Sequence, residues 1–184
     1  NNIVDIKPVG IDTAGKIFAY SDMKTQRAGA NINKGIEIDF FNTSDRVLRH
    51  CYYFSVNLDN EHLPKNKDFS KMVSSHKGET TTYVKSASYL MHKEYFSTIR
   101  DLILNNSNYV LEDDSGIPYK YFAIDKWKPT LYGTYTGSIP LFTHVFQTDL
   151  STAFKDTALN KKLPFGIGYK YIAGESNLMY FKKK

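Results

Sequence analysis

The sequence has very little cysteine and no apolar run of membrane-spanning length. Cys51 is the single cysteine among 184 residues, so no internal disulfide is possible, and no C-x-x-C or Cys/His cluster predicts a structural zinc site. No apolar run approaches the roughly 18–20 residues of a transmembrane helix. The fold must therefore be stabilised by packing. The chain begins Asn1-Asn2-Ile3, without Met or the layout of a signal peptide, and we expect a processed or truncated product.

Phosphate-binding and metal-binding motifs are also missing. Neither G-x-x-x-x-G-K-[ST] nor G-x-G-x-x-G occurs, which argues against nucleotide binding by such loops. The five histidines show no H-x-H or H-E-x-x-H spacing, so we expect no metal site and no cofactor. Cys51 lies in an apolar, aromatic run, which favours a buried and inert thiol over a nucleophile.

Basic residues exceed acidic residues by a small margin. The chain has 24 Lys and Arg against 19 Asp and Glu, a formal net charge of +5. Basic residues beside aromatic residues are typical of single-stranded nucleic-acid binding. Here acidic residues interleave with the basic ones along almost the whole chain, which is typical of an ordinary solvated surface. We therefore expect no nucleic-acid partner.

The hydrophobic pattern predicts an α+β fold. The length and the lack of a linker predict a single domain over residues 1–184. Alternating or aromatic runs predict strands over residues 3–9, 17–20, 35–40, 46–57, 109–111, 127–136, 165–171 and 178–181. The turn residues 42–45 predict that 35–40 and 46–57 form a hairpin. Helical spacing predicts helices over residues 68–78, with Asp68 as the cap, and over 148–158. Residues 86–105 are predicted to form either one helix or two short ones divided near 92–93. This order predicts a mostly antiparallel sheet with helices packed on one face.

One polar turn, Asp113-Asp114-Ser115-Gly116, carries residues suited to chemistry. Its carboxylates and hydroxyl would be accessible to a cation, a hydroxyl or an amine. His92, on a helical segment, would complete a hydrolase-like site with Asp113 or Asp114 as its partner and Ser115 as nucleophile. There is no G-x-S-x-G elbow, however. The plain alternative is a structural turn in which Asp114 caps the next helix, with His92 satisfied by a neighbouring group.

Aromatic residues are abundant, with 14 Tyr, 12 Phe and 1 Trp. They concentrate in residues 119–135 and 169–181. Tyr119, Trp127, Tyr132 and Tyr135 predict a platform for a small molecule, a glycan or a peptide, because aromatic rings pack against amphipathic ligands. The alternative is that these rings fill the two faces of a sheet.

Several segments together resemble a family of uncharacterised, exported bacterial proteins. The resemblance rests mainly on K-S-A-S-Y-L-M-H at 85–92, D-D-S-G-I-P at 113–118 and L-P-F-G-I-G-Y at 163–169. Members of this family are longer and carry an upstream segment that is absent here. The resemblance therefore implies that the chain is the C-terminal part of a longer protein, that the upstream segment is a possible partner, and that the setting is extracytoplasmic, either periplasmic or secreted. It implies no catalytic residues.

Two functional hypotheses follow. The first is a non-catalytic ligand-binding or interaction domain of an exported bacterial protein, with its ligand surface formed by the 113–121 turn and the neighbouring aromatic residues. The second is a hydrolase-like enzyme that uses His92 with Asp113 or Asp114 and Ser115. The two differ in whether His92 lies within hydrogen-bonding distance of those groups in a concave pocket.

Overall fold

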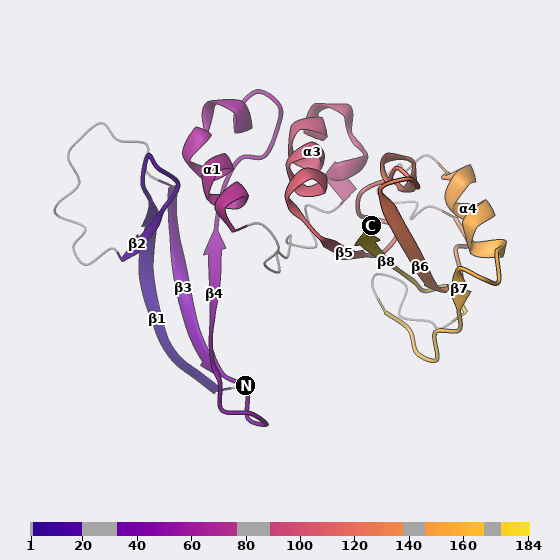
Figure 1. Cartoon of the computed structure of the whole chain (residues 1–184), viewed down its shortest axis with the longest axis horizontal. Helices are drawn as coiled ribbons and strands as arrows, with labels where there is room; N and C mark the ends of the chain where they lie inside the picture. Colours follow the sequence, from indigo (N-terminus) through magenta and orange to yellow (C-terminus); the bar gives the residue numbers. More distant parts are fainter. Residues whose placement is uncertain (1, 20–32, 77–88, 138–145, 168–173) are drawn as a thin grey trace. The chain divides into compact units, whose positions relative to one another are not determined.

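The computed structural model describes residues 2–19, 33–76, 89–137, 146–167 and 174–184. These residues form an α+β fold with three α-helices and two mostly antiparallel sheets. The chain divides into two compact units, Asn1–His76 and Lys77–Lys184, each with a sheet of its own (Figure 1). The predicted fold class is confirmed, with two sheets where the pattern predicted one. The single domain stays a prediction.

The first unit is built on a four-stranded antiparallel sheet. Its strands in spatial order are β2 (Ile17–Ala19), β1 (Asn2–Ile11), β3 (Asn33–Phe41) and β4 (Leu48–Phe54). β3 and β4 form the predicted hairpin. At its tip the Arg46 N–H donates to the Asn42 carbonyl at 2.9 Å, and Arg46 adopts a φ of 54°. This left-handed residue lets the chain reverse within a short turn.

The helix α1 (Lys67–Ser75) covers one end of this sheet. Its Phe69 and Met72 are buried, as are Val9 and Ile11 near the end of β1. The first half of β1 is exposed, because the long strands continue well beyond the helix (Figure 1). The sheet face on the side of α1 therefore has a buried apolar end and an uncovered end.

The N-terminus of α1 corrects a detail of the sequence analysis. Asn66 caps this helix, where the pattern favoured Asp68, and its side-chain oxygen accepts the Phe69 N–H at 3.3 Å. The same side chain exchanges two hydrogen bonds of 2.7 Å with the side chain of Asn33 on β3. The cap therefore also ties the helix to the sheet.

The second unit contains the other four-stranded sheet. Its strands in spatial order are β5 (Tyr109–Glu112), β8 (Asn177–Lys183), β6 (Trp127–Gly133) and β7 (Asn160–Lys161). The β6–β7 pair is parallel and the other two pairs are antiparallel. One face carries the fully buried side chains of Leu131, Met179 and Phe181. This face forms the core of the unit.

Short helical segments cover that inner face. The ring of Phe122, just after the 3₁₀ turn η5 (Tyr119–Tyr121), stacks on Phe181 with centroids 3.6 Å apart and an interplanar angle of 4°. The helix α4 (Thr148–Lys155) contributes Leu150, which is fully buried. α4 ends at Lys155, whereas the sequence pattern predicted a helix that continues to Ala158.

Of the two alternatives for the long helical segment, the structure shows the divided one. The segment consists of η3 (Tyr89–His92), η4 (Glu94–Phe96) and α3 (Ser97–Asn106), and residues 86–88 lie outside the described part of the chain. Lys93 adopts an extended conformation between the two 3₁₀ turns. Arg100 of α3 is buried, and its Nη1 donates to the carbonyls of Met91 and Lys93 at 2.8 and 2.7 Å. These two hydrogen bonds stabilise the break.

Two further expectations change. Cys51 is exposed, since its position in the alternation of β4 places it on the sheet face opposite α1. Residues 165–167 of the predicted strand over 165–171 are irregular, and residues 168–171 lie outside the described part of the chain.

Candidate functional site

The Asp113–Gly116 turn follows β5 and is closed by its own hydrogen bonds. The Asp113 carboxylate accepts the Ser115 backbone N–H at 3.0 Å and the Ser115 hydroxyl at 2.5 Å, and the Asp113 carbonyl accepts the Gly116 N–H at 3.0 Å. Ser115 is only 1% exposed. This arrangement orders the backbone and buries the hydroxyl. It gives no support to Ser115 as a nucleophile.

Gln147, immediately before α4, connects this turn to two of the predicted aromatic residues. Its amide nitrogen donates to the Asp114 carbonyl at 3.4 Å, and its amide oxygen accepts the Tyr119 N–H at 2.8 Å. Its backbone N–H donates to the Tyr135 hydroxyl at 3.0 Å. From the other side, the side chain of Asn177 accepts the Asp114 N–H at 2.8 Å. Asp114 is buried, and η5 follows Pro118 without a side-chain cap, so Asp114 does not cap that turn.

Glu112 is a half-buried acid with an enclosed carboxylate oxygen, and the sequence analysis missed it. Its Oε2 accepts the Ile117 N–H at 2.7 Å, while Oε1 is buried with no hydrogen-bond partner among the described residues. Burial raises the pKa of the Glu112 carboxyl well above its ordinary value, the Ile117 hydrogen bond opposes that shift, and the negative charge of Asp113 adds to it. Glu112 precedes Asp113 and Asp114, the two acids of the predicted site. That its side chain points toward the core follows only from the register of β5, in which Glu112 is opposite Met179.

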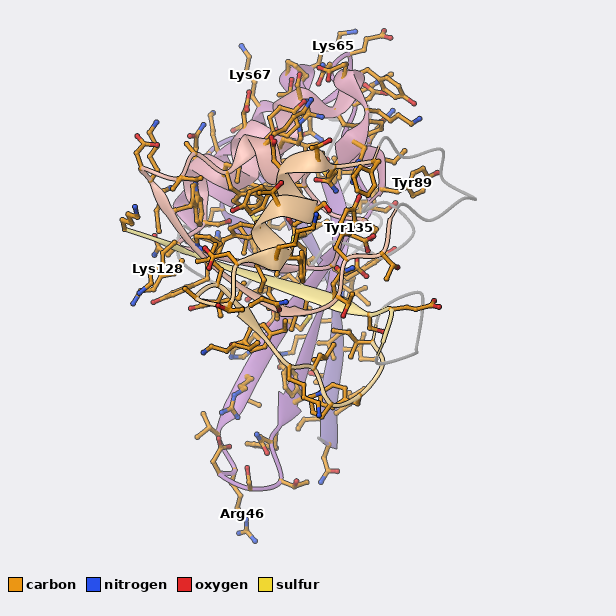
Figure 2. The ribbon with its side chains drawn as sticks, turned by 90° about the vertical axis from the view of Figure 1, so that its right-hand side faces the viewer. Arg46, Lys65, Lys67, Tyr89, Lys128 and Tyr135 are labelled. Atoms are coloured by element: carbon orange, nitrogen blue, oxygen red, sulfur yellow. The ribbon has the colours of Figure 1, made fainter. Side chains whose placement is uncertain are left out.

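Three of the four aromatic residues predicted to bind ligand belong to the interior. Trp127 packs edge-on against Phe122 with centroids 5.6 Å apart, and Tyr119 packs on Phe181 at 6.0 Å. Tyr135 lies beside α4, as Figure 2 shows. Burial raises the pKa of the Tyr119 and Tyr135 hydroxyls. The buried positions of Tyr119, Trp127 and Tyr135 fit the alternative in which aromatic residues fill a sheet face.

His92 lies in a different segment from the turn. It ends η3, is half-buried, and is flanked by the two carbonyls that Arg100 binds. The described contacts thus bring together Asp113 with Ser115, and Asp114 with Tyr119 and Tyr135 through Gln147. The network is formed by residues of the 113–119 segment together with residues 135, 147 and 177.

The fourth aromatic residue, Tyr132, lies on the outer face of the same sheet. The strand register places nine residues on this side, and none of them is buried. We call this surface the open face; it consists of Tyr109, Leu111, Lys128, Thr130, Tyr132, Lys161, Leu178, Tyr180 and Lys182. Tyr109 and Leu111 are 53% and 64% exposed, and Lys128 extends away from the ribbon in Figure 2. The sequence analysis found Tyr132 and missed its two tyrosine neighbours.

The open face combines aromatic rings with positive charge. The rings of Tyr109 and Tyr180 stack with centroids 5.9 Å apart and an interplanar angle of 13°. The Lys182 ammonium lies 5.9 Å from the Tyr109 ring centroid, and the Lys161 ammonium lies 5.8 Å from that of Tyr132. The nine residues of this face include three lysines and no acid. Such a surface attracts anions and offers flat apolar contacts.

The first unit carries a separate group of charged residues on the uncovered end of its sheet. Nδ1 of His50 on β4 lies 2.7 Å from Oδ1 of Asp39 and 3.0 Å from Oε1 of Glu37, both on β3. Lys7 of β1 binds Oδ2 of Asp39 at 2.5 Å and lies 3.7 Å from Asp5. The hydrogen bonds from Lys7 and His50 lower the pKa of Asp39, and the bond to Asp39 raises the pKa of His50 and of Lys7.

Comparison with protein-family models, with curated proteins and with solved structures found no match. The resemblance to exported bacterial proteins and the extracytoplasmic setting therefore stay predictions. No helix within the described ranges is long and apolar enough to cross a bilayer.

Proposed function

We propose that the chain is a non-catalytic binding module and that the open face of its second unit binds an anionic glycan. The observation that supports this most directly is the combination of three tyrosines and three lysines, with no acid, on one side of a sheet whose other side is the core. The extracytoplasmic setting implied by the resemblance is part of the same proposal.

The tyrosines of the open face suit sugar rings. One side of many sugar rings presents C–H groups, which pack on an aromatic ring, and the phenol hydroxyl is available for hydrogen bonds with sugar hydroxyls. Tyr180 lies between Leu111 and Thr130 in the strand register, and Tyr132 lies between Leu178 and Lys161. A flat, half-apolar strip therefore crosses the sheet from strand to strand.

The lysines suit widely spaced negative charges. Lys128 and Lys182 are directly opposite one another on β6 and β8, while Lys161 is opposite Tyr132. The positions of Lys128 and Tyr132 are four residues apart along β6, which corresponds to about 13 Å at roughly 3.3 Å per residue. A polysaccharide with an acid on every second sugar has charges at roughly such intervals. A nucleic-acid strand carries a phosphate on every nucleotide and is usually bound along a continuous basic groove.

Binding of acidic oligosaccharides to the full chain tests this proposal. Fragments of hyaluronan, which has one carboxylate on every second sugar, are titrated into the protein, with a neutral cello-oligosaccharide, a dT20 oligonucleotide and a poly-glutamate peptide as comparisons. We expect saturable binding of an acidic oligosaccharide that weakens as salt is raised from 50 to 300 mM. Tyr180→Ala and Tyr132→Ala should each lower the affinity by about ten-fold, which corresponds to a loss of about 1.4 kcal/mol of binding free energy.

Matched controls separate the open face from general effects. Tyr95→Ala removes a tyrosine that is 57% exposed on η4, and Lys155→Ala removes an exposed lysine at the end of α4. Both variants should bind as the unaltered chain does. Tighter binding of dT20 than of any oligosaccharide would assign the face to nucleic acid. Equal losses in the control variants, or no binding of any acidic probe, would contradict the proposal.

A further inference from the structure

We infer that Glu37, Asp39 and His50 form a binding site for a divalent transition-metal ion, for which Zn²⁺ is the best fit. The site lies on the sheet of the first unit, so it does not depend on the function proposed for the open face. The regular metal-binding spacings are missing from the sequence because the three residues come from two strands and meet through the register of the sheet.

The strand register places all three side chains on the same face. Glu37 and Asp39 are two residues apart on β3, so they point to the same side, and His50 is directly opposite Asp39 on β4. One ligand atom from each residue lies within 4.8 Å of the other two. This side of the sheet is the one that α1 covers at its other end, where Val9 and Ile11 are buried. The cluster thus sits on a rigid, hydrogen-bonded support.

The distances suit a small ion. Zn²⁺ is bound by imidazole nitrogen and carboxylate oxygen at about 2.0–2.2 Å, which in tetrahedral geometry places two ligand atoms on one ion roughly 3.3–3.6 Å apart. The Nδ1 atom of His50 lies 2.7 Å from Asp39 Oδ1 and 3.0 Å from Glu37 Oε1. Side-chain movements of less than about 1 Å would therefore admit the ion. Ca²⁺ needs six to eight oxygen ligands at longer distances, and a nitrogen ligand does not suit it.

Charge and orientation favour a cation at the same point. Asp5, Glu37 and Asp39 oppose the single ammonium of Lys7, which leaves two negative charges when the imidazole is neutral. Lys7 binds Oδ2 of Asp39, so Oδ1 is the oxygen directed at His50. Hydrogen bonds of this kind to the second oxygen of a ligating carboxylate hold it in position in metal sites. His50 is 45% exposed in its side chain, which leaves room for water to complete the coordination.

Calorimetric titration of the full chain with ZnCl₂ in a non-coordinating buffer tests the inference, with MgCl₂ as the comparison ion. We expect one Zn²⁺ per chain, with binding weakened about ten-fold or more in Glu37→Gln and in His50→Gln. Zn²⁺ should also raise the melting temperature of the unaltered chain and not that of either variant, because a ligand that binds the folded state stabilises it. Circular dichroism shows whether each variant is folded, and the two variants alter the site independently.

His62→Gln is the matched control. His62 also holds a carboxylate through Nδ1, at 2.8 Å from Asp59, and its side chain is 51% exposed, but Asp59 is its single acidic partner within the described ranges. This variant should bind Zn²⁺ with the affinity of the unaltered chain. If all three variants bind equally, or if the unaltered chain shows no saturable one-to-one binding, the cluster is an ion-pair network only and the inference is overturned. Binding of Mg²⁺ as tight as that of Zn²⁺ would overturn the assignment to a transition-metal ion.

Discussion

Replacement of Glu112 by Gln should change how the stability of the second unit depends on pH. Burial raises the pKa of this carboxyl in the folded chain well above the ordinary value of 4.5. The folded chain therefore binds this proton more tightly than the unfolded chain does. As pH rises, the carboxyl loses its proton in the unfolded chain at a lower pH than in the folded chain. The stability that the group contributes is complete below pH 4.5 and is lost between 4.5 and its folded pKa. Gln keeps an acceptor for the Ile117 N–H and cannot ionise.

The size of the effect follows from linkage. A single group whose proton is bound in the folded chain and released in the unfolded chain changes the free energy of unfolding by at most about 1.4 kcal/mol per pH unit. Urea denaturation at pH 5, 6, 7 and 8, followed by the fluorescence of Trp127, measures this slope in the unit that contains Glu112. Relative to Glu112→Gln, the unaltered chain should lose stability as pH rises above 5, and the loss should end once pH exceeds the folded pKa of Glu112. Glu175→Gln, at an exposed position of the same unit, should leave the slope unchanged. Parallel pH profiles for the unaltered chain and Glu112→Gln would refute the reasoning.

Two further substitutions test the packing of each unit by urea denaturation. Gly133→Ala should destabilise the second unit by more than Gly137→Ala. Both glycines have positive φ, 88° and 127°. A Cβ at Gly133 would lie 2.1 Å from the Ser176 carbonyl oxygen, whereas a Cβ at Gly137 would meet nothing within 4 Å. Gly137→Ala should cost about 1–2 kcal/mol from its backbone conformation alone, and equal losses would show that the close approach at Gly133 is unimportant. Asn66→Ala should cost roughly 1 kcal/mol for the lost cap of α1 and about 1 kcal/mol more for the lost pairing with Asn33. Asn66→Ser should recover the first part only, and a Ser variant as unstable as the Ala variant would contradict the assignment of the cap.

Local patterns were enough to predict most of the regular elements. The alternation of apolar and charged residues in 35–40 predicted β3, and the polar residues 42–45 predicted the hairpin to β4, because both signals lie within the segment that forms the structure. The end of α4 and the cap of α1 were wrong by a few residues. α4 is followed by a local turn in which the Asp156 side chain accepts the Ala158 N–H at 2.8 Å, and Asn66 is held at the start of α1 by its bond with the distant Asn33.

The candidate sites depended more strongly on distant contacts. Gln147 binds a turn about thirty residues earlier in the chain, and no local pattern marks it out from other glutamines. The strand containing Tyr132 was predicted, but the alternation alone does not say which face the core will cover. Tyr132 therefore appeared equivalent to Trp127, which is buried. The Glu37, Asp39 and His50 cluster likewise requires the pairing of β3 with β4 in one particular register.

The open face can be tested most directly by mapping a bound acidic oligosaccharide on the full chain by NMR. The account predicts that amide shifts on titration concentrate along β5, β6 and β8, with the largest changes around Tyr109, Tyr132 and Tyr180, and that they diminish as salt is raised. Shifts concentrated instead in η5 and α4, which cover the opposite face of the sheet, or an unchanged spectrum at saturating ligand, would contradict it.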